Sequence, residues 1–169
     1  AALIEDMTYT GSLKPTDWFV FEMDEAYAPL FTQNLSPKLV VALNVLRDQL
    51  DRYGEIDKTA QLIKQAGSKA EIFVFNALDP LLSNVASELE GSVTVSSFGI
   101  SNSLLGKVRN EQTLHGQSVS SANRAVDTRL EDYKELGDDQ DVHIKSDGND
   151  LNVALPLVGF HNALNCTAS

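Results

Sequence analysis

The sequence predicts an α/β fold with a mainly parallel sheet that ends in a C-terminal β-hairpin. Within residues 70–97, an apolar run, a helix pattern and a second apolar run follow one another within about thirty residues, which is the length of a βαβ unit. A further apolar, aromatic run at 18–23 (WFVFEM) is typical of a buried strand. Asp147-Gly148 stands between two β-rich segments and is a strong hairpin signal.

The first element is the aromatic run, for which we expect a strand near 18–22. Acidic side chains follow directly, at Glu22, Asp24 and Glu25. The C-terminal end of this strand is therefore predicted to carry negative charge.

The second apolar run, residues 39–46, allows two interpretations. Ser36 as N-cap, Pro37 at the first helical position and Gly54 at the end would frame a helix. A short β-rich apolar run is equally typical of a buried parallel strand. The local pattern alone favours the helix.

The middle of the chain gives clearer signals. A helix is predicted over 57–66, with Asp57 as its cap and Gly67 at its end. A buried strand follows near 71–75, and Asp79-Pro80 starts a helix that runs to Glu90. The apolar residues on one face of that helix are Leu81, Leu82, Val85 and Leu89. Residues 93–97 alternate like a strand.

The last third of the chain is predicted from weaker patterns. Residues 99–117 are rich in Gly, Ser, Asn and Gln and indicate a loop. Apolar residues recur every three or four positions over 118–136, which predicts an amphipathic helix. The hairpin is expected near 142–157.

Three aspartates, Asp138, Asp139 and Asp141, precede the hairpin. A cluster of carboxylates can hold a metal ion, but it is more often a solvated acidic turn. We interpret this cluster as such a turn.

Composition limits the classes of function. The 169 residues suffice for one domain, and their net charge of −11 disfavours binding to nucleic acid. A nucleotide site is still compatible with that charge, because it depends on local groups. The chain has no apolar run of about 18 residues, which predicts no transmembrane segment, and it shows no signal peptide. Cys166 stands alone, which fits a reducing cytoplasm.

Four separated segments match one known family in order. They are FEMDEA (21–26), LNVLRDQLDRYGEID (43–57), FNALDPLL (75–82) and LPLVGFHNALN (155–165). Together they resemble the central domain of the Mur ligases. The stretch RDQLDRYGEID, with Gln49 where the amino-acid-adding ligases have histidine, is similar to the MurT branch, the subunit of lipid II isoglutaminyl synthase.

The resemblance implies a three-layer α/β fold in which residues 1–169 form part of a central ATP-binding domain. In that fold the run 39–44 is a central strand, which reverses the preference for a helix. Asn44 and Arg47 then fall at the C-terminal edge of the parallel sheet, where open α/β folds bind ligands. Glu22 and Asn76 would end neighbouring strands and converge there.

The resemblance also implies the chemistry. Mur-type enzymes use ATP and Mg²⁺ to activate a carboxylate as an acyl phosphate, and a nitrogen nucleophile then forms the amide. Glu22 matches the acid that binds the metal, and Asn162 and Asn165 match the pair that holds adenine and ribose. Asn44, Asn76 and Asp79 complete the expected cofactor-binding set. Asn44 and Asn76 are expected chiefly to hold loops of the site together.

Other residues in these motifs are open to two interpretations. Arg47, Asp48, Asp51 and Arg52 either form local ion pairs that shape a turn or act directly on the ligand. His161 is expected to be packed or to face solvent.

MurT-type proteins are thought to work with a class I glutaminase subunit that supplies ammonia. The resemblance therefore implies a glutaminase partner and lipid II or a related peptidoglycan precursor as substrate. The expected product carries D-isoglutamine in place of D-glutamate, and the expected location is the cytoplasm.

The sequence departs from the family pattern in several places. No G-x-x-x-x-G-K-[ST] phosphate loop is present, since GSLKPT (11–16) has the wrong spacing. The C-terminal Mur domain is also missing, and a divergent insert at 103–140 replaces the four-cysteine zinc ribbon of many MurT proteins. Leu78 replaces an acid and Val158 a proline.

These departures leave alternatives open. The chain is either part of a longer enzyme or an inactive Mur-like remnant with a binding or structural role. An amino-acid-adding Mur ligase is a third possibility, against which Gln49 counts.

Overall fold

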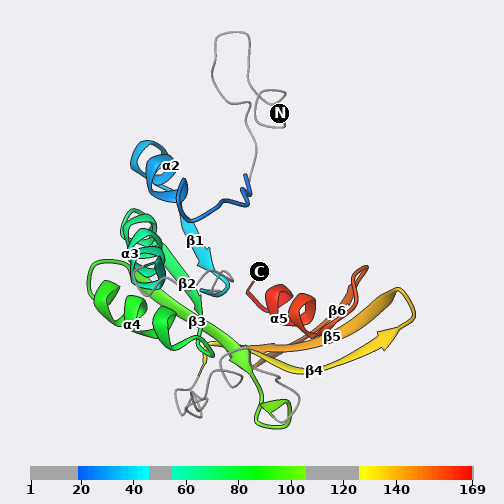
Figure 1. Ribbon diagram of the computed structural model, residues 1–169. Helices are drawn as coiled ribbons and strands as arrows, with labels where there is room; N and C mark the ends of the chain where they lie inside the picture. Colours follow the sequence, from blue (N-terminus) through cyan, green and yellow to red (C-terminus); the bar gives the residue numbers. More distant parts are fainter. Residues whose placement is uncertain (1–18, 46–54, 106–125, 169) are drawn as a thin grey trace.

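The computed structural model describes residues 19–45, 55–105 and 126–168. These ranges contain one six-stranded sheet whose spatial order follows the sequence, from β1 to β6. Strands β1 to β4 pair in parallel, and β4 to β6 pair antiparallel as a meander. A mainly parallel sheet that ends in hairpin strands is what the sequence predicts (Figure 1).

The strands are β1 (Leu39–Ala42), β2 (Ile72–Asn76), β3 (Thr94–Ile100), β4 (Thr128–Leu136), β5 (Asp139–Ser146) and β6 (Asn149–Leu155). The helices are α2 (Ala28–Leu35), α3 (Glu55–Gly67), α4 (Pro80–Leu89) and α5 (Phe160–Cys166). Within the described ranges, no helix is long and apolar enough to cross a membrane.

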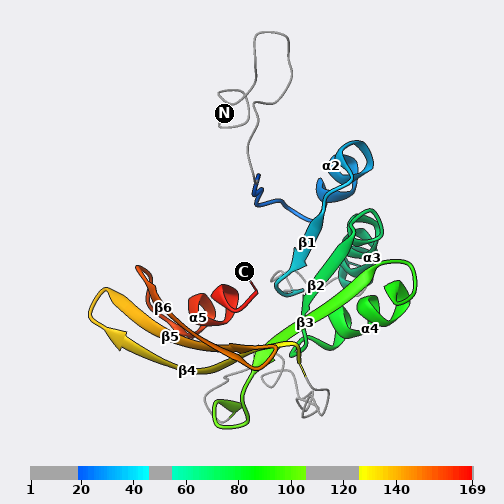
Figure 2. The same cartoon turned by 180° about the vertical axis from the view of Figure 1, so that it is seen from behind.

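Helices lie on both faces of the sheet, which gives three layers. Helices α3 and α4 cover one face of β1 to β3, and α5 lies on the other side, against β4 to β6 (Figures 1 and 2). Each face has its own apolar core. The core under α3 and α4 consists of Ala42, Val45, Phe73, Phe75, Leu82, Val85, Ala86 and Leu89. The core under α5 consists of Phe98, Ile100, Leu104, Leu130, Val142, Ile144, Ala163 and Leu164.

The central strand β2 shows why its sequence is a continuous apolar run. Successive side chains of a strand point to opposite faces. Phe73 and Phe75 enter the core under α3 and α4, whereas Val74 packs against the core under α5. Both faces are covered, so each position from Ile72 to Phe75 is apolar, and the strand ends at the polar Asn76.

The predicted hairpin is present and forms part of a three-stranded meander. Asp147 and Gly148 both have positive φ, at 49° and 81°, as a two-residue type I′ turn requires. Gly137, with φ of 78°, lies in the turn between β4 and β5. The aspartates around that turn are exposed.

The helix expected over 118–136 is wrong where the structure describes it, because residues 128–136 form β4. The register of β4 against β5 shifts between Leu130 and Asp132, which marks a β-bulge. The shift brings both Leu130 and Tyr133 to the core under α5, although they are three positions apart and would face opposite sides of a regular strand. A bulged strand therefore imitates the spacing of a helix.

The strand expected near 18–22 is also wrong, since residues 19–24 form no regular structure and Trp18 lies outside the described residues. Val20 is 91% exposed, so this apolar segment is not buried against the sheet. A strand is stabilised by pairing and by a covered face, and the described residues provide neither. The run expected as a central strand over 39–44 is a strand over Leu39–Ala42. Its expected central position is wrong within the described residues, because β1 lies at the edge of the sheet and pairs there only with β2.

Two helices are absent from the sequence-based prediction. Helix α2 has Pro29 in its first turn and ends at Ser36, whose φ of 42° is left-handed. Helix α5 follows Gly159. Both are short, at 8 and 7 residues, so their apolar periodicity is weak.

Candidate functional site

The turn from β2 into α4 is built by Asp79, which caps the helix. Its Oδ1 accepts hydrogen bonds from the backbone N–H groups of Leu81 at 2.9 Å and Leu82 at 3.4 Å. Pro80 follows as the first helical residue, where its missing N–H costs nothing. The helix start predicted from Asp79-Pro80 is confirmed.

The same turn holds the end of β1. The second carboxylate oxygen of Asp79, Oδ2, accepts the N–H of Val45 at 2.7 Å. The side chain of Asn76 donates from Nδ2 to the carbonyl of Leu43 at 3.0 Å, and its Oδ1 accepts the N–H of Leu78 at 3.0 Å. Asn76 and Asp79 are both buried. Together they fix the backbone on both sides of Asn44.

Asn44 lies between these two anchors, and its side chain is exposed. It makes no hydrogen bond with any residue that the structure describes. Strands β1 and β2 are parallel neighbours, so the topology brings Asn44, Asn76 and Asp79 to one edge of the sheet, which is where Asn44 and Asn76 were expected. Asn76 and Asp79 shape this edge, and Asn44 is the amide exposed there. Direct contact of any of them with a cofactor stays a prediction.

Two further amides lie on α5. Asn162 and Asn165 are three residues apart and therefore share one face of the helix. Asn162 Nδ2 donates to the carbonyl of Val158 at 2.8 Å, which leaves its oxygen available. Asn165 is partly exposed and makes no side-chain hydrogen bond within the described ranges. His161 is exposed, with its ring edge-on to Phe160.

Packing connects α5 with the edge that carries Asn76. Ala163 and Leu164 of α5 belong to the same core against which Val74 and Leu78 pack. The amides of α5 thus belong to the layer opposite α3 and α4, on the face shared with the β2–α4 turn.

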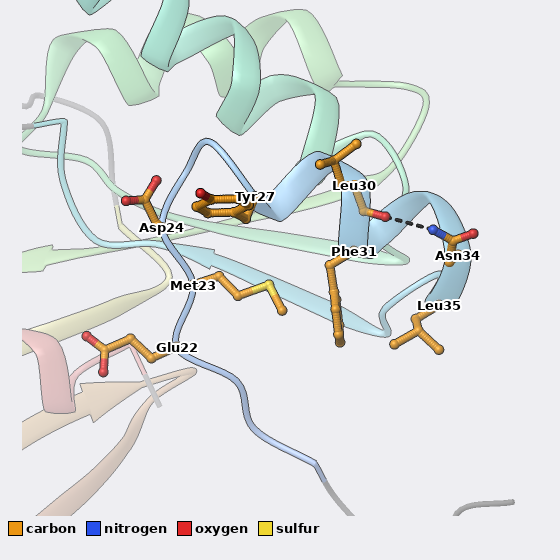
Figure 3. A pocket seen from close by; sticks show the side chains of 8 residues that line it. All are labelled: Glu22, Met23, Asp24, Tyr27, Leu30, Phe31, Asn34 and Leu35. Carbon is orange, nitrogen blue, oxygen red and sulfur yellow. Dashed lines mark hydrogen bonds between the residues drawn. The ribbon is translucent and has the colours of Figure 1, made fainter. Parts of the chain in front are cut away.

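Glu22, the expected metal ligand, lies elsewhere than at a strand end. It borders a hollow of about 510 Å³ between the segment before α2 and α2 itself (Figure 3). The other residues around this hollow are Met23, Asp24, Tyr27, Leu30, Phe31, Asn34 and Leu35. The carboxylates of Glu22 and Asp24 point to the opposite side of the chain from the Met23 side chain (Figure 3).

The convergence of Glu22 with Asn76 through neighbouring strand ends is not observed, because the segment that carries Glu22 is not a strand. Asp24 uses Oδ1 to accept the N–H of Ala26 at 2.8 Å, which starts the turn into α2. Among the described residues, no group of three or more His, Cys, Asp or Glu side chains could hold a metal ion. The metal-binding role of Glu22 stays a prediction.

The motif residues Arg47, Asp48, Asp51 and Arg52 lie outside the described residues, so their two interpretations remain open.

Sequence reasoning missed Gln140, which is completely buried in β5. Its Nε2 donates to the carbonyl of Gly159 at 3.3 Å. The available signal was its position two residues before Val142, on the face of the strand that Val142 and Ile144 bury. A polar residue at such a position requires a partner.

Cys166, at the end of α5, is a free thiol that lies partly buried. Burial disfavours the charged thiolate and raises the pKa of Cys166 above its ordinary value.

Comparison with protein families gives one match. The family model described as "Mur ligase middle domain" matches residues 3–169, which is nearly the whole chain.

Among curated proteins, the chain is similar to the MurT subunit of lipid II isoglutaminyl synthase (glutamine-hydrolyzing) from two strains of Staphylococcus aureus, COL and N315. Each is 37% identical over 89 residues, which is 50% of this chain and 20% of the relative. The matched part therefore spans about a fifth of the length of these relatives.

Among solved structures, the chain is similar to MurF from Acinetobacter baumannii, with a TM-score of 0.61 and 16% identity over 83% of this chain and 26% of that one. A UDP-N-acetylmuramoyl-L-alanyl-D-glutamate–2,6-diaminopimelate ligase gives a TM-score of 0.62 and 14% identity over 94% of this chain and 28% of that one. At these identities the likeness establishes the fold.

Proposed function

Because this chain belongs to the Mur ligase family through its middle domain, we propose that it forms part of an enzyme that uses ATP to make an amide bond in peptidoglycan synthesis. In the proposed reaction a substrate carboxylate attacks the γ-phosphate of ATP, which gives an acyl phosphate and ADP. A nitrogen nucleophile then displaces phosphate and forms the amide.

The proposed substrate is the D-glutamate carboxyl group of lipid II, which becomes the carboxamide of D-isoglutamine. The observation that carries this proposal is the 37% identity over 89 residues to MurT subunits of lipid II isoglutaminyl synthase. Those relatives are named as subunits of a glutamine-hydrolyzing enzyme. We therefore propose that a separate glutaminase subunit supplies ammonia as the nucleophile.

The described residues fit the nucleoside end of ATP. An asparagine amide offers both a donor and an acceptor, which is what the edge of a purine requires. Asn162 and Asn165 offer two such groups on one helix face, and Asn44 offers a third at the sheet edge. Asn76 and Asp79 hold that edge in place through their backbone hydrogen bonds. These roles support binding of the nucleoside by α5 and by Asn44 after β1, while the β2–α4 turn holds the edge of the sheet in place.

Glu22 is the residue proposed to hold Mg²⁺. This ion binds oxygen ligands and is usually held in nucleotide sites by one or two carboxylates together with phosphates and waters. A single exposed carboxylate fits that pattern, with Asp24 two residues away. When bound, Mg²⁺ neutralises charge on the phosphoryl group that is transferred.

The 169 residues contain no G-x-x-x-x-G-K-[ST] segment. We propose that the contacts with the β- and γ-phosphates come from residues outside this sequence. The isolated chain would then hold one end of the nucleotide and lack catalytic activity.

The test uses the protein as its host makes it, purified with any associated subunit. Lipid II is incubated with this preparation, ATP, Mg²⁺ and glutamine, and mass spectrometry measures whether a carboxyl group has become a carboxamide. The proposal predicts amidated lipid II, one ADP per amide, and recovery of a glutaminase in the purified complex. Unchanged lipid II with both glutamine and ammonium salt would overturn the proposed function. Addition of an amino acid would assign the protein to the other Mur ligases.

A further inference from the structure

Gln140 is a buried amide that the proposed reaction does not use. Its side chain is 0% exposed, and it shares its face of β5 with Val142 and Ile144. Within the described residues its Oε1 has no hydrogen-bond partner. Leaving a buried acceptor unpaired costs free energy of folding, so an apolar residue would suit this position better for stability alone.

The hydrogen bond that Gln140 does make ends at the start of α5. Its Nε2 donates to the carbonyl oxygen of Gly159, the residue that precedes the helix. The same carbonyl accepts the N–H of Ala163 at 3.2 Å, which is the first backbone hydrogen bond of α5. Gly159 has φ of 106° and ψ of 149°, a conformation that side chains other than glycine rarely adopt. Gln140 therefore contacts the point that sets the direction of the helix.

Helix α5 needs such an anchor because few directed interactions of its own fix its orientation. It is 7 residues long and has no side-chain cap at its N-terminus. Ala163 and Leu164, together with Phe160 and Cys166, hold it to the sheet through apolar contacts, which fix distance better than rotation. A directed hydrogen bond to Gly159 supplies the missing orientation.

We propose that Gln140 is a positioning residue that orients α5 so that Asn162 and Asn165 meet the nucleoside of the bound nucleotide. This inference rests on the proposed function, since it assumes that α5 binds the nucleoside. Gln140 acts through the helix and touches no ligand itself. The unpaired Oε1 is then a stability cost that accompanies nucleotide affinity.

The test is the substitution Gln140→Met in the protein as its host makes it. Methionine keeps the length and the unbranched shape of glutamine but cannot bond to Gly159. We expect the Tm without ligand to stay the same or rise. We expect the Kd for Mg-ADP, measured by calorimetry, to rise about tenfold. The Kd for inorganic tripolyphosphate should not change, because that probe lacks the nucleoside.

The matched control is Asn152→Met, the same kind of exchange at an exposed position on the neighbouring strand β6. It should change neither the Tm nor the Kd for Mg-ADP. Hydrogen exchange adds a readout that needs no ligand. In Gln140→Met the amides of α5, including Ala163, should exchange faster while those of β2 and β3 keep their rates.

The outcomes separate the two proposals. An equal Kd for Mg-ADP in wild type and Gln140→Met, with ADP clearly bound, would overturn the positioning role alone. A lower Tm in both Gln140→Met and Gln140→Leu would show that the amide serves stability, which also overturns it. Unchanged exchange in α5 would do the same. A wild-type protein that binds neither ADP nor adenosine would overturn the proposed function and the role of Gln140 with it.

Discussion

The carboxylate of Asp79 accepts the backbone N–H of Val45 at 2.7 Å, which ties the start of α4 to the end of β1 across 34 positions of sequence. The other oxygen of the same carboxylate caps α4 through Leu81 and Leu82. One side chain thus holds two elements at the edge of the sheet where Asn44 is exposed.

The substitution Asp79→Asn should keep the cap on α4 and remove the hydrogen bond to Val45. An asparagine can still cap α4 with its oxygen, but its amide nitrogen then faces the N–H of Val45, and two donors cannot bond. We expect the free energy of unfolding to fall by about 1.5–3 kcal/mol, the usual value of a hydrogen bond to a charged group. Urea denaturation measures this loss, and hydrogen exchange should show faster exchange at Val45.

The matched control is Asp24→Asn, because Asp24 also accepts a backbone N–H, that of Ala26, but in an exposed turn. Its effect should stay within about 0.5 kcal/mol, as for most surface substitutions. If Asp79→Asn lowered the free energy of unfolding as little as Asp24→Asn, the bond to Val45 would contribute nothing to stability.

Gly67, at the end of α3, is expected to tolerate no side chain. A Cβ atom there would lie 2.7 Å from Cδ2 of the buried Phe73 ring and 3.0 Å from Cδ1 of Leu89. Overpacking of this kind costs about 1–3 kcal/mol, which exceeds the roughly 0.5–1 kcal/mol that alanine gains over glycine in a helix. Thermal unfolding of Gly67→Ala should therefore show a lower Tm.

The control for Gly67→Ala is Gln65→Ala, an exposed position of the same helix. It should leave the Tm nearly unchanged. A Tm for Gly67→Ala equal to or above that of wild type would contradict the packing between α3 and β2.

Cys166 should react slowly with thiol reagents at neutral pH. Burial raises the pKa of its thiol, and the thiolate is the reactive form. The rate of modification by a disulfide reagent should increase as the pH rises through and beyond the ordinary thiol pKa of about 8.5. In urea, which exposes the thiol, the reaction at neutral pH should be several times faster. Equal rates in the folded and unfolded chain would contradict this environment for Cys166.

The parts of the fold that the sequence predicts correctly are those with both a strong apolar pattern and residues that mark where an element begins or ends. The helix after Asp79-Pro80 and the turn at Asp147-Gly148 are examples, because capping and positive φ are properties of the residues themselves. Strand β4 was misassigned because the bulge after Leu130 depends on pairing with β5. No local pattern contains that information.

The candidate site was also predicted only in part, because some of its features follow from topology and others depend on how the elements pack. Parallel strands end at a common edge, so the proximity of Asn44 to Asn76 follows from topology. The bonds of Asn76 and Asp79 to the β1 backbone do not, because they depend on the spacing between strand ends. Gln140 was missed because its partner, the Gly159 carbonyl, lies 19 positions away.

The isolated 169-residue chain should bind Mg-ATP at best in the millimolar range and should not hydrolyse it. The phosphate loop of the family supplies charge-assisted contacts with the β- and γ-phosphates, and this sequence has none. The loss of several such contacts, at about 1.5–3 kcal/mol each, weakens binding by several orders of magnitude. Calorimetry on the chain alone measures this affinity. A micromolar Kd would mean that the phosphates bind elsewhere on these residues.

The measurement that bears most directly on ATP use by this protein is the Kd for Mg-ADP of Asn162→Ala and Asn165→Ala, in the protein as its host makes it. Each substitution removes an amide proposed to hold the nucleoside, so each should raise the Kd about tenfold while the Kd for tripolyphosphate stays constant. Asn149→Ala, at an exposed position of β6, is the control and should bind like wild type. Wild-type affinity in both α5 variants would contradict nucleoside binding by α5.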